Sequence, residues 1–349
     1  MKRILSLMLA ALMLFSLVAC GQKESAVTSG SIEDGKVYEL RLATDIVPEN
    51  YVVKYMNDAI AEIEEKTDGH VKIKMYAGGT LGSYTAVHSQ LITGDIDMAI
   101  NFIDPNYDAR LNVFIFPGLY TDYSNFVDTM APGTYLWNLL NDIEGGFNLE
   151  LLGAVNSGLM GLGTVKPVPS DFATCVDYNT KKDILLRIPA MDLYLNLLTD
   201  MGYRTTTIAY SDLYPALQTG VADGWAGGTP VNNWDSFRDV IKYYVDAQYL
   251  CETLPIVINK DSIAQLPEEY QAVIREVFLN AANTASAESE VQANTAMDNM
   301  EDMGITVIKG TADEHTAFIE EIRTVTWPKL ESLIGEDIFA DLCAEFGIA

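Results

Sequence analysis

One short pattern occurs twice in this chain and constrains the fold more than any other feature. Residues 91–99 read LITGDIDMA, and residues 217–226 read LQTGVADGWA. In both copies a helical stretch ends at a glycine, Gly94 or Gly220, which can adopt the left-handed conformation that ends a helix. An aspartate follows each glycine three residues later, where a short strand is expected to begin. The repeat therefore predicts two similar α/β lobes rather than one large sheet.

The first part of the chain alternates between strand and helix patterns. Residues 37–43 read as a strand, and between 51 and 66 apolar residues recur at helical spacing until Gly69 closes the element. Residues 71–76 alternate apolar and polar side chains, as in a half-buried strand. This order is typical of an α/β domain with a largely parallel sheet.

A long helix is expected near the C-terminal end. Residues 267–303 begin at Pro267, contain no further proline and no glycine, and are rich in Ala, Glu and Gln. An unbroken helix over this stretch would extend roughly 55 Å at about 1.5 Å per residue, which is longer than one small lobe. Such a helix would lie across both lobes. The alternative is two helices with a bend near Asn283 and Thr284.

The N-terminus has the features of a secretory signal, because two basic residues precede a long apolar run. This run is shorter than the about 20 apolar residues of a membrane span. The sequence LVAC at 17–20 resembles the bacterial lipobox, which implies that residues 1–19 are removed and that Cys20 is lipidated. The alternative is an ordinary cleaved signal with an incidental cysteine. Residues 20–36 read as a flexible tether, and we expect an extracytoplasmic protein held at the cell membrane by its lipid.

The net charge of −27 at pH 7 limits the classes of partner. So acidic a chain is not expected to bind nucleic acid or an anionic lipid surface, because both need basic patches. An anionic ligand would need a locally placed cation. Cys175, Cys251 and Cys343 are far apart and are expected to be small buried hydrophobic residues rather than metal ligands. The alternative is that two of them form a disulfide.

Enzyme motifs are sparse. Residues 30–36 match most of a phosphate-binding loop, but Val37 stands where a magnesium-binding hydroxyl is required. There is no Gly-x-Ser-x-Gly nucleophile motif. His70, His88 and His315 lack the spacing of metal ligands. We therefore expect no catalysis, no metal and no cofactor.

Arg187 differs from the other arginines because it lies within an apolar stretch, residues 184–189. A buried guanidinium without a partner is costly, so Arg187 needs a carboxylate. Its planar fork suits bidentate capture of such a group. The residues themselves leave open whether that carboxylate belongs to the protein or to a ligand.

The segment around Arg187 resembles the core motif of a known receptor family. The strand at 184–189, the Met-Gly pair at 201–202 and above all AYSDLYPALQTGVADG at 209–224 are similar to the solute receptors of TRAP transporters, in the dicarboxylate-receptor (DctP) branch. Further matches follow in order along nearly the whole mature chain, at 79–82, 91–99, 166–167, 237–243 and 266–269.

The resemblance implies an α/β, two-lobed fold like that of periplasmic binding proteins, with a hinge and with the long C-terminal helix spanning both lobes. Lobe I is expected at 37–156 and 253–292, and lobe II at 157–252 and 293–349. The implied function is a receptor, not an enzyme. It would capture a carboxylate-bearing small organic acid and deliver it to membrane permease subunits, and we expect it to act as a monomer.

In this family the arginine of the strand motif binds the ligand carboxylate, which implies that role for Arg187. The chain departs from the family at WAGGTP, residues 225–230, where a pocket asparagine is missing, and at Met160, where no second arginine stands. Aromatic residues near the strand ends predict a ligand with one carboxylate and a less polar body, although such residues also often pack a hinge or core. The expected ligand-binding residues are Arg187, Trp225, Tyr210, Phe102, Tyr84, Asp45, Asn101, Gly227 and Trp234.

Two other functions share some of these sequence features. A lipoprotein receptor of an ABC transporter shares the anchor and the two lobes but generally lacks the pattern at 210–224. A surface-anchored hydrolase would need a nucleophile or metal cluster, which the sequence does not offer.

Overall fold

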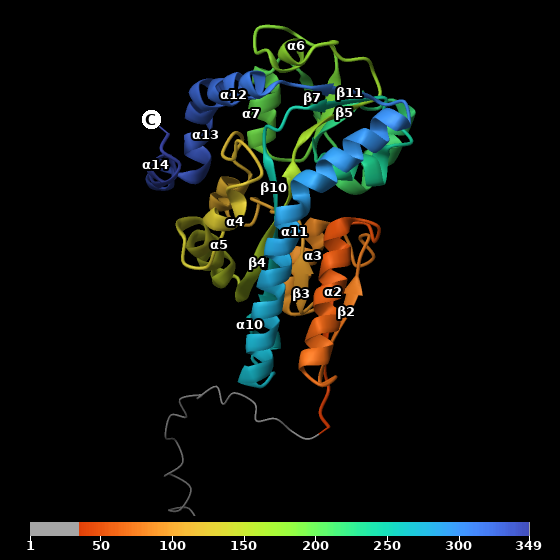
Figure 1. Ribbon diagram of the computed structural model, residues 1–349. Helices are drawn as coiled ribbons and strands as arrows, with labels where there is room; N and C mark the ends of the chain where they lie inside the picture. Colours follow the sequence, from red (N-terminus) through yellow and green to blue (C-terminus); the bar gives the residue numbers. More distant parts are fainter. Residues whose placement is uncertain (1–34, 349) are drawn as a thin grey trace, which may run out of the picture.

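The computed structural model describes residues 35–348, which form two lobes with one β-sheet each (Figure 1). The expected signal at 1–19, Cys20 and nearly all of the expected tether lie outside the described residues. Within the described residues no helix is both long and apolar enough to cross a membrane.

The first sheet contains five strands in the order β2-β1-β3-β10-β4. β1 is parallel to β2 and β3, whereas β10 is antiparallel to β3 and β4. The alternation expected at 71–76 is present in β2, whose first four residues alternate between buried and exposed. The strands are β1 (Tyr38–Ala43), β2 (Val71–Tyr76), β3 (Met98–Ile100), β4 (Leu149–Leu159) and β10 (Cys251–Asn259).

The second sheet contains six strands in the order β11-β9-β5-β8-β6-β7. β6 is parallel to both β7 and β8, and β5 is antiparallel to β8 and β9. These strands are β5 (Gly161–Thr164), β6 (Leu185–Ile188), β7 (Arg204–Thr207), β8 (Gly224–Gly228), β9 (Tyr243–Asp246) and β11 (Thr306–Lys309).

Helices and single helical turns connect and cover the two sheets (Figure 1). They are α2 (Tyr51–Lys66), α3 (Tyr84–Thr93), η1 (Ala109–Ile115), α4 (Phe126–Thr129), α5 (Tyr135–Gly146), α6 (Phe172–Val176), α7 (Asp192–Asp200), η2 (Tyr210–Asp212), α8 (Leu213–Thr219), α9 (Pro230–Asn232), η3 (Asn233–Phe237), α10 (Lys260–Ile263), α11 (Glu268–Asp302), α12 (Ala312–Glu321), η4 (Ile322–Thr326), α13 (Trp327–Ile334) and α14 (Glu336–Glu345).

The internal repeat has the structural meaning that the sequence predicted. Gly94 ends α3 with a φ of 76°, and Gly220 ends α8 with a φ of 75°. Both residues are in the left-handed region, where glycine pays no steric penalty. Each helix is followed by a short strand, β3 in the first sheet and β8 in the second. The two lobes therefore contain the same helix–glycine–strand unit.

The chain crosses between the sheets several times. β4 continues almost directly into β5, and β9 leads back into β10. The two crossing segments lie side by side, because the Met160 amide donates to the Leu250 carbonyl at 2.7 Å and the Tyr249 amide donates to the Met160 carbonyl at 3.2 Å. These paired segments connect the two lobes at the place where the hinge is expected.

The third crossing is α11, which is one unbroken helix of 35 residues, so the alternative of two bent helices is wrong. It packs against α2 and β4 of the first lobe and against β11 of the second. Figure 1 shows it running from α10 at one end of the molecule to the region of β11 at the other. The expectation of a long C-terminal helix that braces both lobes is confirmed.

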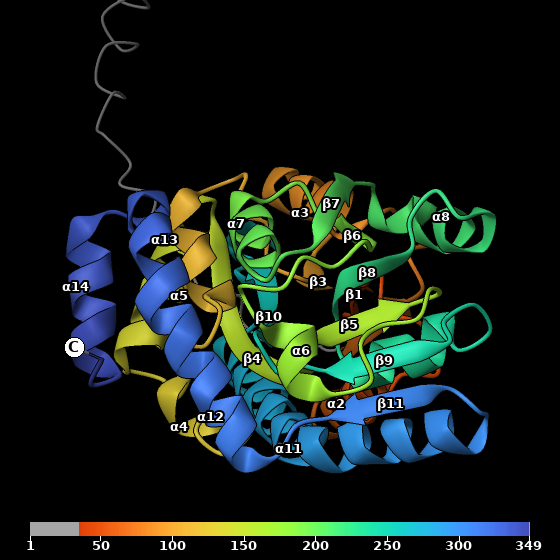
Figure 2. The same ribbon diagram turned by 90° about the horizontal axis from the view of Figure 1, so that it is seen from above.

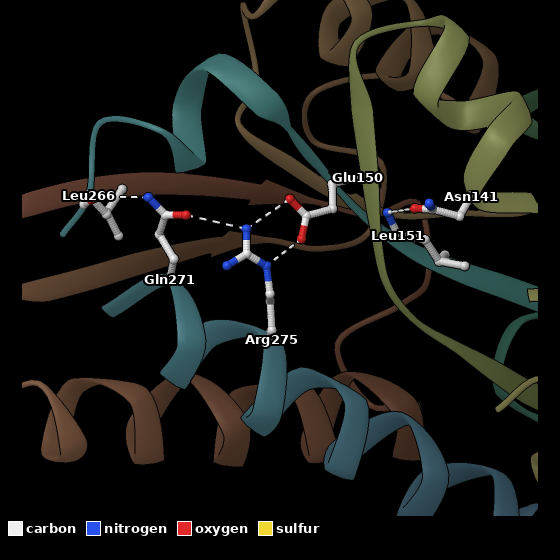
Figure 3. A network of polar contacts seen from close by, with 6 residues as sticks. All are labelled: Asn141, Glu150, Leu151, Leu266, Gln271 and Arg275. Carbon is white, nitrogen blue, oxygen red and sulfur yellow. Dashed lines mark hydrogen bonds and ion pairs between the residues drawn. The ribbon is translucent and has the colours of Figure 1, made fainter. Parts of the chain in front are cut away.

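Polar contacts fix the first half of α11 to the sheet (Figure 3). The Arg275 guanidinium donates to both carboxylate oxygens of Glu150 on β4, with the Nη2–Oε2 contact at 3.1 Å. Gln271 accepts from Arg275 at 3.3 Å and donates to the Leu266 carbonyl at 2.8 Å. On the buried face, the Asn156 amide donates to Ser286 Oγ at 2.9 Å. The helix is therefore tied to β4, the strand that enters the hinge.

The C-terminal helices α12, α13 and α14 form one side of the molecule, and α8 lies on the opposite side (Figure 2). Trp327 of α13 donates its indole N–H to the Pro117 carbonyl at 2.7 Å and packs on Phe116, with ring centroids 5.0 Å apart. These contacts anchor the end of the chain on the segment after η1. The residue numbers expected for the lobe boundaries stay a prediction.

Cys175, Cys251 and Cys343 are all free thiols, so the alternative of a disulfide among them is wrong. Cys175 and Cys251 are buried, as expected of small hydrophobic residues, whereas Cys343 is half-buried. Burial raises the pKa of Cys175 to about 12, so this thiol stays protonated at neutral pH.

Candidate functional site

A cavity lies where the strand ends of the two sheets face one another, and it encloses about 730 Å³ of space, part of it open to solvent. Its walls come from the segments that follow β1, β3 and β7 and from β4, β6, β8 and β10. Clefts at the carboxyl ends of parallel strands are the usual ligand sites of open α/β folds. The lining residues are Asp45, Ile46, Val47, Asn50, Tyr84, Phe102, Ser157, Arg187, Pro189, Tyr194, Tyr210, Trp225, Gly227, Asn232, Ser236, Glu252 and Leu254.

Most of the residues that the sequence pointed to meet in this cavity. Two of them, Asn101 and Trp234, do not line it. The residues that do are Arg187, Trp225, Tyr210, Phe102, Tyr84, Asp45 and Gly227.

Arg187 is buried in β6, with only 4% of its surface exposed. Its Nε donates to the Ile208 carbonyl at 2.7 Å, and its guanidinium lies over the ring of Tyr210 at 5.9 Å from the centroid. No carboxylate of the described residues forms an ion pair with it. Burial lowers the pKa of Arg187, but an arginine side chain keeps its proton in proteins. The guanidinium therefore carries a buried positive charge, and no acidic side chain among residues 35–348 forms an ion pair with it.

Asp45 follows β1 and is held by the backbone around it. Its carboxylate accepts from the Tyr84 amide at 3.3 Å, and its own amide donates to Asn101 Oδ1 at 3.4 Å. Burial of the carboxyl group raises its pKa to about 6, against the lowering effect of the Tyr84 amide. Tyr84 packs edge-on against Phe102, with ring centroids 5.9 Å apart. These residues form the first lobe's side of the cavity.

Glu252 is a site residue that the sequence reasoning missed. It lies in β10 with 8% of its surface exposed and accepts from Ser157 Oγ. The Asn232 amide donates to both of its oxygens, at 3.0 and 2.9 Å. Burial, reinforced by the charge of Asp45, raises the pKa of Glu252 to about 7, although both hydrogen-bond donors act to lower it.

A signal for Glu252 was present in the sequence. Residues 249–258 form an apolar stretch in which Glu252 is the single charged residue. The same argument that selected Arg187, a charge inside an apparently buried strand, applies to it. Ser157 and Asn232 carry no comparable signal, because polar uncharged residues are common at strand ends and caps.

Trp225 lines the cavity but is also a core residue, because only 1% of its surface is exposed. Its indole N–H donates to Asn233 Oδ1 at 3.0 Å, and its ring packs on Phe237 at 4.8 Å between centroids. A Cβ on Gly228 would lie 2.1 Å from the indole, so the glycine makes room for this ring. The sequence left two roles open for Trp225, a ligand contact and packing in the core. The structure shows the packing role.

Gly227 has a φ of 115°, a conformation that side chains rarely adopt. A Cβ on Gly227 would lie 3.5 Å from the Tyr194 hydroxyl, so the backbone of β8 passes close to this lining residue. The Tyr194 hydroxyl donates to Met160 Sδ at 3.2 Å. The resemblance led us to expect an asparagine-bearing motif at this segment, residues 225–230. Backbone and aromatic rings, rather than an amide side chain, line the cavity here.

Contacts between the lobes also close the rim of the cavity. Asn50, at the N-terminus of α2, donates to Asp235 of η3 at 3.3 Å. The Asn50 side chain also accepts from the Val52 amide at 2.9 Å and so caps α2. The two lobes therefore face each other across the cavity at hydrogen-bonding distance.

The two expected residues outside the cavity have other surroundings. Asn101 lines a smaller, neighbouring cavity with His88 and Glu144, and its Nδ2 has no hydrogen-bond partner among residues 35–348. Trp234 lies beneath Arg238, whose guanidinium is 5.2 Å from the indole centroid. The Asn101 side chain does not line the larger cavity. It accepts the hydrogen bond of the Asp45 backbone amide and so helps to position Asp45.

Among residues 35–348, no three histidine, cysteine, aspartate or glutamate side chains come together as they would in a metal site. The charged groups of the main cavity are Arg187, Asp45 and Glu252, and several aromatic side chains line it with them. Chemically, this arrangement suits recognition of a small polar molecule.

Comparison with known proteins gives a consistent result. The family model DctP, described as bacterial extracellular solute-binding protein, family 7, matches residues 43–331. A solute-binding protein of Chromohalobacter salexigens is 26% identical over 294 residues, which cover 80% of this chain and 83% of that protein.

Solved structures agree with the fold. A TRAP periplasmic solute-binding protein from Sulfitobacter sp. NAS-14.1, with bound β-D-galacturonate, has a TM-score of 0.76 and 22% identity. The alignment covers 89% of this chain and 100% of that one. A second such protein, from Desulfovibrio salexigens with bound orotic acid, has a TM-score of 0.76 and 19% identity, and the alignment covers 88% of this chain and 99% of that one.

Proposed function

Because this chain belongs to family 7 of the bacterial extracellular solute-binding proteins, the receptors of TRAP transporters, we propose that it captures its ligand in the cavity between the lobes with Arg187 as the carboxylate anchor. Membership of this family means that the protein is a binding protein and not an enzyme. It also decides against the surface-anchored hydrolase and the ABC-type receptor.

One observation carries the assignment of Arg187. A buried guanidinium whose terminal nitrogens have no carboxylate partner among the described residues lines the cavity between the lobes. Leaving such a charge unpaired is costly, and a bound carboxylate would provide the missing counter-charge. Its planar fork can donate two parallel hydrogen bonds to the two oxygens of one carboxylate.

Calorimetry on variants tests this role. Removing one partner of a buried charge pair typically costs about 3–5 kcal/mol, so Arg187→Ala should weaken carboxylate binding by two decades or more. Arg187→Lys should restore only part of the affinity, because an ammonium cannot match the fork. Arg187→Ala binding like the wild type would show that the carboxylate is held elsewhere.

Arg323 offers a matched control. Its guanidinium also donates to backbone carbonyls, those of Gly118 at 2.9 Å and Leu119 at 3.4 Å, but it lies outside the cavity. Arg323→Ala removes a comparable structural contact and should leave ligand affinity unchanged. A loss of affinity in both variants would indicate a general effect of arginine removal on the fold.

A thermal-shift screen of small organic acids would identify ligands. A ligand present at 100 times its dissociation constant stabilises the folded protein by about 2.7 kcal/mol, which is easily detected. Acids with one carboxylate, with two and with sugar-like bodies belong in the panel. The hits then enter the calorimetry with Arg187 variants.

The protein acts outside the cytoplasm, as its family does. We propose that it delivers the ligand to membrane permease subunits and that Cys20 carries a lipid anchor. Support for the anchor comes from the lipobox-like sequence at 17–20. Cys20→Ala should release the protein from the membrane fraction, and retention of this variant would contradict the anchor.

We also propose that ligand capture closes lobe I (37–156 and 253–292) onto lobe II (157–252 and 293–349). The paired strands around Met160 and Leu250 would bend, and the contact of Asn50 with Asp235 would stabilise the closed form. Small-angle scattering should show a smaller radius of gyration with ligand. An unchanged radius would argue for a preformed, rigid site.

A further inference from the structure

The cavity contains two acidic side chains that no ion pair neutralises. Asp45 accepts from a backbone amide, and Glu252 accepts from Ser157 and Asn232, all of them neutral donors. Among residues 35–348, neither carboxylate has a lysine, arginine or histidine partner. The cavity therefore presents one unpaired cation, Arg187, and two unpaired acids.

These opposite charges do not neutralise each other. Among residues 35–348, no hydrogen bond or ion pair joins Arg187 to Asp45 or Glu252, although all three side chains line the same cavity. Tyr210 lies within the electrostatic reach of all three groups. The guanidinium and the two carboxyl groups are therefore separate groups of one cavity that a bound ligand can contact at the same time.

The hydrogen bonds around Glu252 suit its ionised form. Asn232 directs its N–H group toward both carboxylate oxygens, so both act as acceptors. A carboxylate in this position still lacks a positive partner, and burying a charge without one is unfavourable. Aromatic rings close by can further stabilise a cation through their electron-rich faces. The nearby rings are those of Tyr84, Phe102, Tyr194, Tyr210 and Trp225.

From this arrangement we propose that the ligand is a zwitterion, with a carboxylate on Arg187 and a positively charged nitrogen that the carboxyl groups of Asp45 and Glu252 recognise. This inference rests on the proposed function and adds the second charged group of the ligand. It replaces the expectation of a less polar ligand body, because Glu252, Ser157 and Asn232 make this part of the cavity polar.

The test uses matched carboxylic acids that differ in one terminal group. Calorimetry on the purified protein compares butyrate, 4-hydroxybutyrate, 4-aminobutyrate and succinate, and then the corresponding five-carbon series. In at least one of the two series, we expect the acid with a terminal amino group to bind about tenfold or more tightly than the acids that end in a methyl, hydroxyl or second carboxyl group. This ratio is equivalent to 1.4 kcal/mol. Tighter binding of the hydroxy acid or of the dicarboxylate in both series would overturn the proposal.

Variants separate this inference from the proposed function. Asp45→Asn and Glu252→Gln should each lower the ratio of 4-aminobutyrate affinity to butyrate affinity, whatever change in absolute affinity the substitution causes. Arg187→Ala should weaken every acid in the series. Suppose that Arg187→Ala weakens the binding of every acid, but Asp45→Asn and Glu252→Gln leave the preference for the amino group unchanged. The zwitterion proposal is then wrong, and the carboxylate assignment of Arg187 stands. If Arg187→Ala changes nothing, the carboxylate assignment fails.

Discussion

Replacing Glu252 by glutamine should change how the stability of the ligand-free protein depends on pH. Burial raises the pKa of this carboxyl from 4.5 to about 7. Between these two values the folded protein holds a proton that the unfolded chain has already lost. Wild-type stability should therefore fall as the pH rises through this window. Glutamine cannot ionise, so this contribution is absent from the variant.

The size of the effect follows from the pKa. One pKa unit corresponds to about 1.4 kcal/mol, so the whole shift is worth on the order of 3 kcal/mol. Lost contacts with Ser157 and Asn232 add an offset to the variant's stability that does not depend on pH. The informative quantity is how the free energy of unfolding of the variant, relative to that of the wild type, changes between pH 5 and pH 8.

Urea denaturation at pH 5, 6, 7 and 8 measures this quantity. Glu252→Gln should gain on the order of 3 kcal/mol relative to the wild type between the two ends of the range. Glu290→Gln, which changes an exposed carboxylate on α11, is the control and should follow the wild-type curve. Parallel curves for Glu252→Gln and wild type would refute the argument that Glu252 is buried without a positive partner.

Further predictions concern the residues around β8. Trp225→Ala should lower the free energy of unfolding of the ligand-free protein by about 3–5 kcal/mol, because the indole is fully buried and hydrogen-bonded; unchanged urea denaturation would contradict its role in the core. Gly228→Ala should cost about 1–3 kcal/mol, since the new methyl group overlaps the Trp225 indole. The control Gly146→Ala, where no atom lies within 4 Å of the added methyl group, should be neutral or stabilising, and equal losses in both glycine variants would contradict the packing argument.

Much of the fold could be predicted from local patterns. The glycine-ended helices at Gly94 and Gly220 and the unbroken helix at 268–302 depend on short-range chemistry, which the sequence displays directly. Arg187 was found for a similar reason, since a charge in an apolar strand is visible without a structure.

The remainder of the site depends on contacts between distant segments. Glu252, Ser157 and Asn232 come from β10, β4 and α9, and they meet only because the hinge strands pair and the lobes face each other. The sequence shows that polar groups of the related receptors are missing near Met160 and Gly227, but not that others replace them. Asn101 lines the smaller of two neighbouring cavities, and its strand-end position does not reveal which of the two its side chain enters.

A crystal structure with a ligand from the screen tests the central claim most directly. We predict both oxygens of the ligand carboxylate within hydrogen-bonding distance of the Arg187 terminal nitrogens, in the cavity lined by Tyr210 and Trp225. A ligand whose carboxylate contacts other groups, with Arg187 facing a carboxylate of the protein instead, would contradict the account.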